Sequence, residues 1–110
     1  MTAIPADLTA EAERRRLLEV VNQRFDGLDL LINNAGVASA GHFADGTEAV
    51  LRQVMEVNFF APAELMRLAL PALMRGRNPA ILNVASMCGR RGLPAWTEDS
   101  ASKCALGGST

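Results

Sequence analysis

The sequence predicts an α/β fold built on a parallel sheet, and three observations lead to this prediction. Two short apolar segments, Leu28–Asn33 and Ala80–Ser86, have the length and composition of buried strands. Longer segments before, between and after them carry apolar residues every three or four positions, as amphipathic helices do. Alternation of helices and strands requires parallel strands joined by right-handed crossovers.

The first helix is predicted over residues 10–25. Residues 2–8 look like the tail of a strand that leads into it, and Thr9 is the predicted N-cap. Gly27 is expected to stop the helix. The apolar face of this helix is formed by residues that recur at spacings of three and four, namely Leu17, Leu18, Val21 and Phe25.

Residues 47–75 follow a loop over residues 37–46 and carry helical periodicity over almost their whole length. Pro62 and Pro71 argue against one straight helix, because proline removes a backbone donor and crowds the preceding turn. We therefore predict two helical segments, with a break near Asn58 and a kink near Pro71. The methionines in the apolar stripes indicate core or partner-helix packing rather than a cofactor site.

The C-terminal part is predicted to add a turn, the second strand, a loop and a last helix. Gly76–Pro79 is the turn before the strand. Residues 87–98 form the loop, and Thr97 is the predicted N-cap of the helix that follows. The Gly107-Gly108 pair is expected to end this helix.

Composition and charge argue against several classes of function. The 110 residues are 49% hydrophobic and 21% charged, as in a soluble single domain. Twelve acidic and eleven basic residues nearly balance, which argues against nucleic-acid binding. Two cysteines and one histidine lack metal-site spacing, and no apolar run is long enough for a membrane span or a signal peptide. We expect a cytoplasmic protein with reduced thiols.

In open parallel sheets, ligands bind beyond the carboxyl ends of the strands. The residues there, with others in fixed order, resemble motifs of the short-chain dehydrogenase/reductase family. Asn33-Asn34-Ala35-Gly36 matches the family's Asn-Asn-Ala-Gly motif after the first strand. Asn58 matches its catalytic asparagine, Ser86 its catalytic serine, and Lys103 the lysine of Tyr-x-x-x-Lys. Asp7-Leu8 matches the position beside the adenine ring, so the resemblance covers nearly the whole chain.

This resemblance implies a partial Rossmann-like, doubly wound parallel sheet. Residues 1–110 would form one incomplete NAD(P)-binding domain, truncated at both ends, with the strands and helices of the centre and the C-terminal half only. The implied activity is hydride transfer between NAD or NADP and a small alcohol or carbonyl substrate. The implied catalytic residues are Asn58, Ser86 and Lys103. The implied cofactor-binding residues are Asp7, Leu8, Asn33, Ala35, Gly36 and Lys103.

In the family's chemistry, a tyrosine hydroxyl passes the proton, and the neighbouring lysine ammonium lowers its pKa. The same lysine holds the nicotinamide ribose. The serine donates a hydrogen bond to the substrate oxygen, and the asparagine holds a water that links the lysine to solvent. Taken singly, Asn58, Ser86, Lys103 and Gly36 also have structural interpretations, as a helix-break amide, a turn hydroxyl, a surface lysine and a turn glycine.

The tyrosine position is occupied by Asp99, thirteen positions after Ser86 and four before Lys103, and the chain has no tyrosine. A carboxyl with a pKa near about 3.9 has no proton to give at neutral pH, and its side chain is shorter than a phenol. Asp99 instead suits the first turn of a helix, with Lys103 as a partner four residues on.

The family's glycine-rich phosphate loop and its later strands are also absent from this sequence. We therefore expect the chain alone to bind NAD or NADP poorly and to be inactive. The Leu28 strand would expose an unpaired edge, so we also expect a chain that is partly folded, aggregation-prone or dependent on a partner.

Two other functions remain open. The first is a non-catalytic module that docks on a full-length relative through the helices of Thr47–Arg75, as a homo- or hetero-oligomer. The second is a working oxidoreductase, which would use an unusual proton path or belong to a longer protein. The substrate and the choice between NAD and NADP are not determined by these residues.

Overall fold

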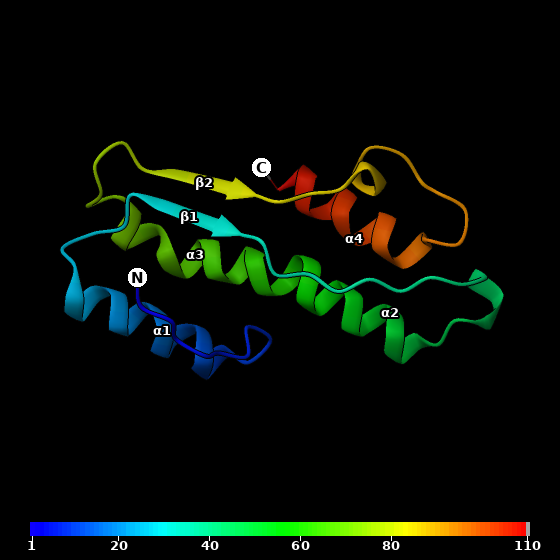
Figure 1. Cartoon of the computed structure of the whole chain (residues 1–110), viewed down its shortest axis with the longest axis horizontal. Helices are drawn as coiled ribbons and strands as arrows, with labels where there is room; N and C mark the ends of the chain where they lie inside the picture. Colours follow the sequence, from blue (N-terminus) through cyan, green and yellow to red (C-terminus); the bar gives the residue numbers. More distant parts are fainter. Residues whose placement is uncertain (110) are drawn as a thin grey trace.

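The computed structural model describes residues 1–109 and confirms the alternation of helices and strands (Figure 1). The described part measures 48 × 26 × 22 Å along its principal axes. A π-helical turn, η2, and two 3-10 turns, η1 and η3, complete the order of elements. That order is α1 (Glu11–Arg24), β1 (Leu30–Asn33), η1 (Phe43–Asp45), α2 (Glu48–Met55), η2 (Glu56–Phe60), α3 (Ala61–Leu73), β2 (Ala80–Asn83), η3 (Met87–Gly89) and α4 (Thr97–Gly108).

The sheet consists of β1 and β2, which run parallel as predicted. Leu30 pairs with Ala80 at one end, and Asn33 pairs with Asn83 at the other. Both strands are shorter than the predicted segments, although the N–H of Val84 still donates to the carbonyl of Asn33 at 2.9 Å. The loops that carry the family motifs therefore leave the same edge of the sheet (Figure 1).

The core lies between one face of this sheet and helices α1 and α3. Leu18 from α1 packs with three residues of α3, and Leu31 and Ile81 reach this cluster from the two strands. Burial of a leucine side chain contributes about 1.5–3 kcal/mol, so this cluster holds α1, α3 and the sheet together. The α3 residues are Leu65, Ala69 and Leu73.

The opposite face of the sheet is apolar and open. Leu30, Ile32 and Leu82 expose 49%, 51% and 52% of their surface. The prediction that both strands are fully buried is therefore wrong for this face, because no element within residues 1–109 covers it. In the same described part, β1 pairs with β2 alone, so the expected unpaired edge of β1 is present.

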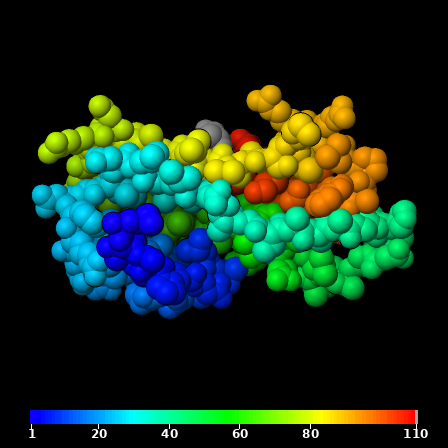
Figure 2. Space-filling view, in the orientation of Figure 1, coloured from blue at the N-terminus to red at the C-terminus, as the bar shows by residue number. Residues whose placement is uncertain are grey.

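The N-terminal segment corrects two predictions. Residues 1–7 form no strand, and α1 is preceded by Ala10 as N-cap, without a side-chain cap bond. Thr9 does not cap the helix because its N–H and hydroxyl both donate to Oδ1 of Asp7, at 2.9 and 2.7 Å. The segment instead lies on the surface beside α1, where Arg16 donates to the carbonyl of Pro5 at 2.6 Å (Figure 2).

The predicted break near Asn58 is a π-helical turn inside a helix that runs continuously from α2 through η2 to α3. The N–H of Ala61 donates to the carbonyl of Glu56, five residues back. Pro62 has no N–H, so it cannot make the usual helical bond to the preceding turn, and widening the turn accommodates it. The helix also continues through Pro71 and ends at Leu73.

Two other helix boundaries differ from the predictions. Helix α1 ends at Arg24 with Phe25 already extended, so Gly27 is not its stop residue. Helix α4 has Trp96 as its N-cap, and Thr97 is its first helical residue. Capping propensity therefore predicted the end of α1 and the start of α4 only to within a few residues.

Gly27 and Gly76 lie where two chain segments cross at the start of the strands. A Cβ on Gly27 would lie 2.8 Å from the backbone of Arg75, and one on Gly76 would lie 2.7 Å from the carbonyl carbon of Leu28. Both contacts involve backbone atoms, which cannot rotate away. The crossing therefore requires glycine at both positions.

We predict that Gly76→Ala lowers the free energy of unfolding by about 1–3 kcal/mol, because the methyl group forces the two segments apart. Urea denaturation followed by circular dichroism measures this loss. Gly107→Ala is the matched control, since a Cβ there meets nothing within 4 Å, and it should leave stability unchanged or slightly raised. Equal midpoints for both variants would contradict the assigned crossing.

Candidate active site

The site lies beyond the carboxyl ends of β1 and β2, where α4 packs against η3, η2 and α2 (Figure 1). Gly36 occupies its centre. A Cβ on this residue would lie 3.3 Å from both Oδ1 of Asn58 and Nζ of Lys103. The structure thus brings together three of the residues that the family motifs single out, from β1's loop, the π turn and α4.

Asn58 is fully buried and its amide clamps the loop after Gly36. Its Oδ1 accepts from the N–H of Val37 at 2.9 Å, and its Nδ2 donates to the carbonyl of Val37 at 2.8 Å. This two-point bond fixes the path of the chain that leaves β1.

Ser102 is a site residue that sequence reasoning missed. It is fully buried, accepts from Nδ2 of Asn58 at 3.0 Å, and donates to the carbonyl of Asp99 at 2.8 Å. Its position three residues after Asp99 on the same helix face was an available signal. Glu98 was also missed; it is buried and accepts from the hydroxyl of Ser39 at 3.3 Å.

Asp99 is 6% exposed, and its Oδ1 lies 3.5 Å from Nδ2 of Asn58. That nitrogen already serves two closer acceptors, so this hydrogen bond is weak. The expected pairing of Asp99 with Lys103 is wrong, since no ion pair joins them within the described residues. Lys103 turns away and donates from Nζ to the carbonyl of Val84 at 3.3 Å.

Ser86 is exposed at the start of the loop that follows β2. Its Oγ accepts from the N–H of Cys88 at 3.3 Å and so begins η3. A Cβ on Gly89, in the same turn, would lie 3.0 Å from the carbonyl oxygen of Lys103. The serine loop therefore rests directly on the helix that carries the lysine.

One of the two residues expected beside the adenine ring, Leu8, lines a cavity together with part of the Asn-Asn-Ala-Gly motif. Leu8, Asn33, Asn34 and Ala35 line a cavity of about 110 Å³ beneath the Asn-Asn-Ala-Gly loop. Asn33 is buried and donates to Oδ1 of Asn83 at 2.8 Å across the two strands.

Asp7, the other residue expected beside the adenine ring, precedes Leu8 in the chain and is exposed. The hydroxyl and N–H of Thr9 lower its pKa, because they stabilise the carboxylate. Asp7 is therefore ionised at neutral pH. This pKa is lower in the folded chain than in the unfolded one, so the hydrogen bonds favour folding above the ordinary carboxyl pKa and lose that effect as the pH falls.

The described residues contain no group of three or more histidine, cysteine, aspartate or glutamate side chains that could hold a metal ion. None of the helices within residues 1–109 is long and apolar enough to cross a membrane. The side chains at this site that could take part in a reaction are those of Ser86, Lys103 and Asp99.

Comparisons with known proteins agree with this geometry. Ketoacyl reductase HetN of Nostoc sp. is 35% identical over 104 residues, which are 94% of this chain and 36% of that protein. Nodulation protein G of Rhizobium sp. is 35% identical over 102 residues, which are 93% of this chain and 42% of that protein. The chain therefore spans well under half the length of these relatives.

Solved structures match over nearly the whole chain. A short-chain dehydrogenase from Streptomyces avermitilis is 33% identical with a TM-score of 0.88, covering 94% of this chain and 38% of that one. A short-chain dehydrogenase/reductase from Burkholderia phymatum, in complex with NAD, is 27% identical with a TM-score of 0.91, covering 97% and 38%. The sequence model described as short chain dehydrogenase matches residues 1–110. The chain belongs to the short-chain dehydrogenase family.

Proposed function

We propose that this chain carries the catalytic edge of an NAD(P)-dependent oxidoreductase whose proton relay is interrupted, and that the chain by itself does not turn over substrate. The single observation that carries the proposal is the buried Asp99 at the position of the proton-passing tyrosine, with Asn58 and Lys103 still in place around Gly36. NAD or NADP, when bound, supplies hydride exchange with an alcohol or carbonyl carbon.

The residues present fit part of that cofactor. The cavity lined by Leu8, Asn33 and Ala35 is where the adenine side would lie, and Asp7, which precedes Leu8 in the chain, is an exposed carboxylate whose pKa is lowered by its bonds with Thr9. Gly36 leaves the space in front of Nζ of Lys103 free of any side chain of its own. Lys103 would then hold the nicotinamide ribose, and Ser86 would donate to the substrate oxygen.

The proton step is where the site fails. Hydride transfer to a carbonyl carbon leaves an oxygen that must receive a proton from a group within hydrogen-bond reach. Asp99 is buried beside the Asn58 amide, and its side chain is shorter than a phenol by a ring, so it does not reach a substrate oxygen as the tyrosine would. Losing a positioned acid typically costs about 10²–10⁴ in rate.

We predict that NADH or NADPH titrated into the purified chain produces no saturable change in nicotinamide fluorescence at micromolar concentrations. The sequence lacks the glycine-rich loop whose backbone N–H groups bind the pyrophosphate, so the adenine and ribose contacts act without it. The short-chain dehydrogenase/reductase from Burkholderia phymatum, which was solved in complex with NAD, serves as the positive control. Micromolar binding by the chain would overturn the proposal that it lacks a competent cofactor site.

A second candidate function is docking on a full-length relative through α2 and α3. Val50 of α2, Phe60 of the η2 turn between the two helices and Leu70 of α3 expose 37%, 50% and 49% of their surface, which favours an additional contact. Such a module would bind its partner and remain catalytically silent. Co-purification with a full-length relative separates this function from that of an isolated, interrupted enzyme.

A further inference from the structure

The two cysteines of the chain meet where η3 packs against α4. Cys88, in η3, is 7% exposed, whereas Cys104, in α4, is exposed, and both are free thiols. The Sγ of Cys104 lies 3.1 Å from the carbonyl oxygen of Gly89 and 3.9 Å from that of Cys88. The Cys104 side chain therefore lies directly over the turn that contains Cys88.

The backbones of the two segments are also in contact. A Cβ on Gly89 would lie 3.1 Å from the Cβ of Lys103 and 3.0 Å from its carbonyl oxygen. Cys88 precedes Gly89 and Cys104 follows Lys103, so the two cysteines flank this point of contact. A disulfide requires Cα atoms about 4.4–6.8 Å apart, so its formation depends on segments that are packed as closely as these two are.

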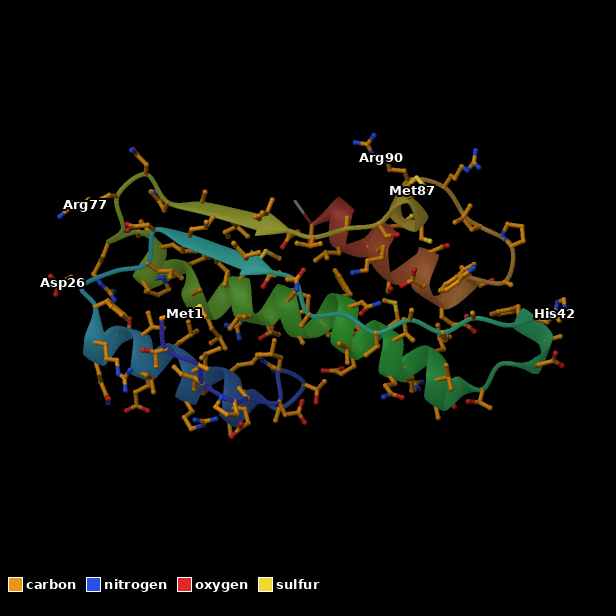
Figure 3. All side chains as sticks on the ribbon, in the orientation of Figure 1. Met1, Asp26, His42, Arg77, Met87 and Arg90 are labelled. Carbon is orange, nitrogen blue, oxygen red and sulfur yellow. The ribbon has the colours of Figure 1, made fainter. Side chains whose placement is uncertain are left out.

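The two thiols differ in solvent exposure, and this difference determines which of them reacts first with a reagent in solution. Met87 and Arg90, labelled in Figure 3, extend outward from the η3 loop, and Met87 is 79% exposed. Cys88 lies between them in sequence but is buried. A reagent in solution therefore meets Cys104 first, and Cys88 is placed to react only from within the protein.

We propose that Cys104 is a thiol modification site for a low-molecular-weight disulfide such as oxidised glutathione, and that Cys88 resolves the adduct. The Cys104 thiolate attacks one glutathione sulfur, which forms a mixed disulfide and releases one glutathione thiolate. The Cys88 thiolate then attacks the sulfur of Cys104 and releases the second glutathione thiolate. The two protein thiols are oxidised, oxidised glutathione is reduced, and the two protons lost by the cysteines pass to the two glutathiones.

The resulting bond would join the two sides of the candidate active site. Ser86 accepts from the N–H of Cys88, and Lys103 precedes Cys104. A Cys88–Cys104 disulfide would therefore join the loop that follows Ser86 to helix α4, which carries Lys103. Residues 88–104 would then form a covalently closed loop. This redox link does not depend on the oxidoreductase activity proposed above, because it involves neither cofactor nor substrate.

The test incubates the purified chain with oxidised glutathione and measures its intact mass. We expect a product that has lost two hydrogen atoms and carries no glutathione. Trypsin cleavage without reductant should then yield residues 78–90 linked to residues 104–110. Cys88→Ser should stop at a single glutathione adduct on Cys104, and Cys104→Ser should remain unmodified while folded.

A second measurement tests whether the folded structure, rather than the short separation of the two cysteines in the sequence, speeds disulfide formation. The folded chain should form the link about tenfold faster than the chain in concentrated urea, because the packed segments hold the sulfurs together. Wild-type protein that stops at the glutathione adduct, or that stays unmodified, would overturn the proposal. Equal rates with and without urea would also overturn it, since the packing would then contribute nothing.

Discussion

Replacing Asp99 with tyrosine is expected to raise the rate of carbonyl reduction by about 10²–10⁴ when residues 1–110 are placed in a complete fold. The suitable host is a chimaera in which this chain replaces the matching segment of ketoacyl reductase HetN, with which it shares 35% identity over 104 residues. The host supplies the rest of a longer protein, since the matched segment is only 36% of HetN. The measurement is oxidation of NADPH or NADH with a ketoacyl substrate.

The expected gain follows from the surroundings of position 99. Lys103 is not held by Asp99, and its ammonium lies beside Gly36 with Val84 as its acceptor. A phenol at position 99 gains a nearby cation, which favours its ionised form and brings its pKa toward neutrality. The phenol also extends farther from α4 than the carboxylate does, toward the substrate oxygen that Ser86 is proposed to hold.

Asp99→Phe is the matched control for this experiment. It supplies the ring without the hydroxyl, so it should remain as slow as the parent chimaera. Dinucleotide binding should be similar in all three proteins, which assigns the difference to the proton step. If the tyrosine and phenylalanine variants turn over equally, or if the Asp99 parent is already as fast, the proposed interruption at Asp99 is wrong.

The order and kind of the elements followed from the sequence because apolar periodicity records which face of each helix is buried. Leu18, on the predicted apolar face of the first helix, does meet Leu65 of α3 in the core. The burial of the strands did not follow, because it depends on what covers a sheet rather than on the strand. Ile32 and Leu82 have the composition of buried residues and are half exposed, since α1 and α3 cover only the other face.

At the candidate site, too, the sequence predicted where the residues lie but not which groups they bond to. The motifs located Asn58 and Lys103, and the structure places both around Gly36. Their hydrogen-bond partners were not predictable, because they are set by packing between distant segments. The Asn58 amide bonds to Val37, 21 residues earlier, and to Ser102, 44 residues later. The same limit explains the absent Asp99–Lys103 pair, since helical spacing permits the contact but does not require it.

Asn58→Leu is expected to lower the free energy of unfolding by about 3 kcal/mol or more. The substitution removes three hydrogen bonds of the Asn58 amide, two to Val37 and one to the fully buried Ser102, and each bond contributes about 0.5–1.5 kcal/mol. Urea denaturation followed by circular dichroism measures the loss, and amide hydrogen exchange at Val37 reports it locally. Asn34→Leu is the matched control, because Asn34 is exposed in the neighbouring motif.

Asn58→Asp separates the loss of a donor from the loss of the whole amide. It keeps an acceptor for the N–H of Val37 but places a second carboxylate where Nδ2 now lies, 3.5 Å from Oδ1 of Asp99. Repulsion between the two carboxylates should add to the lost donation, and Asp99→Asn in the same chain should recover part of the stability. Additive effects of the two substitutions would show that Asp99 and Asn58 do not interact. Unchanged stability and Val37 exchange in Asn58→Leu would show that this amide does not hold the loop to α4.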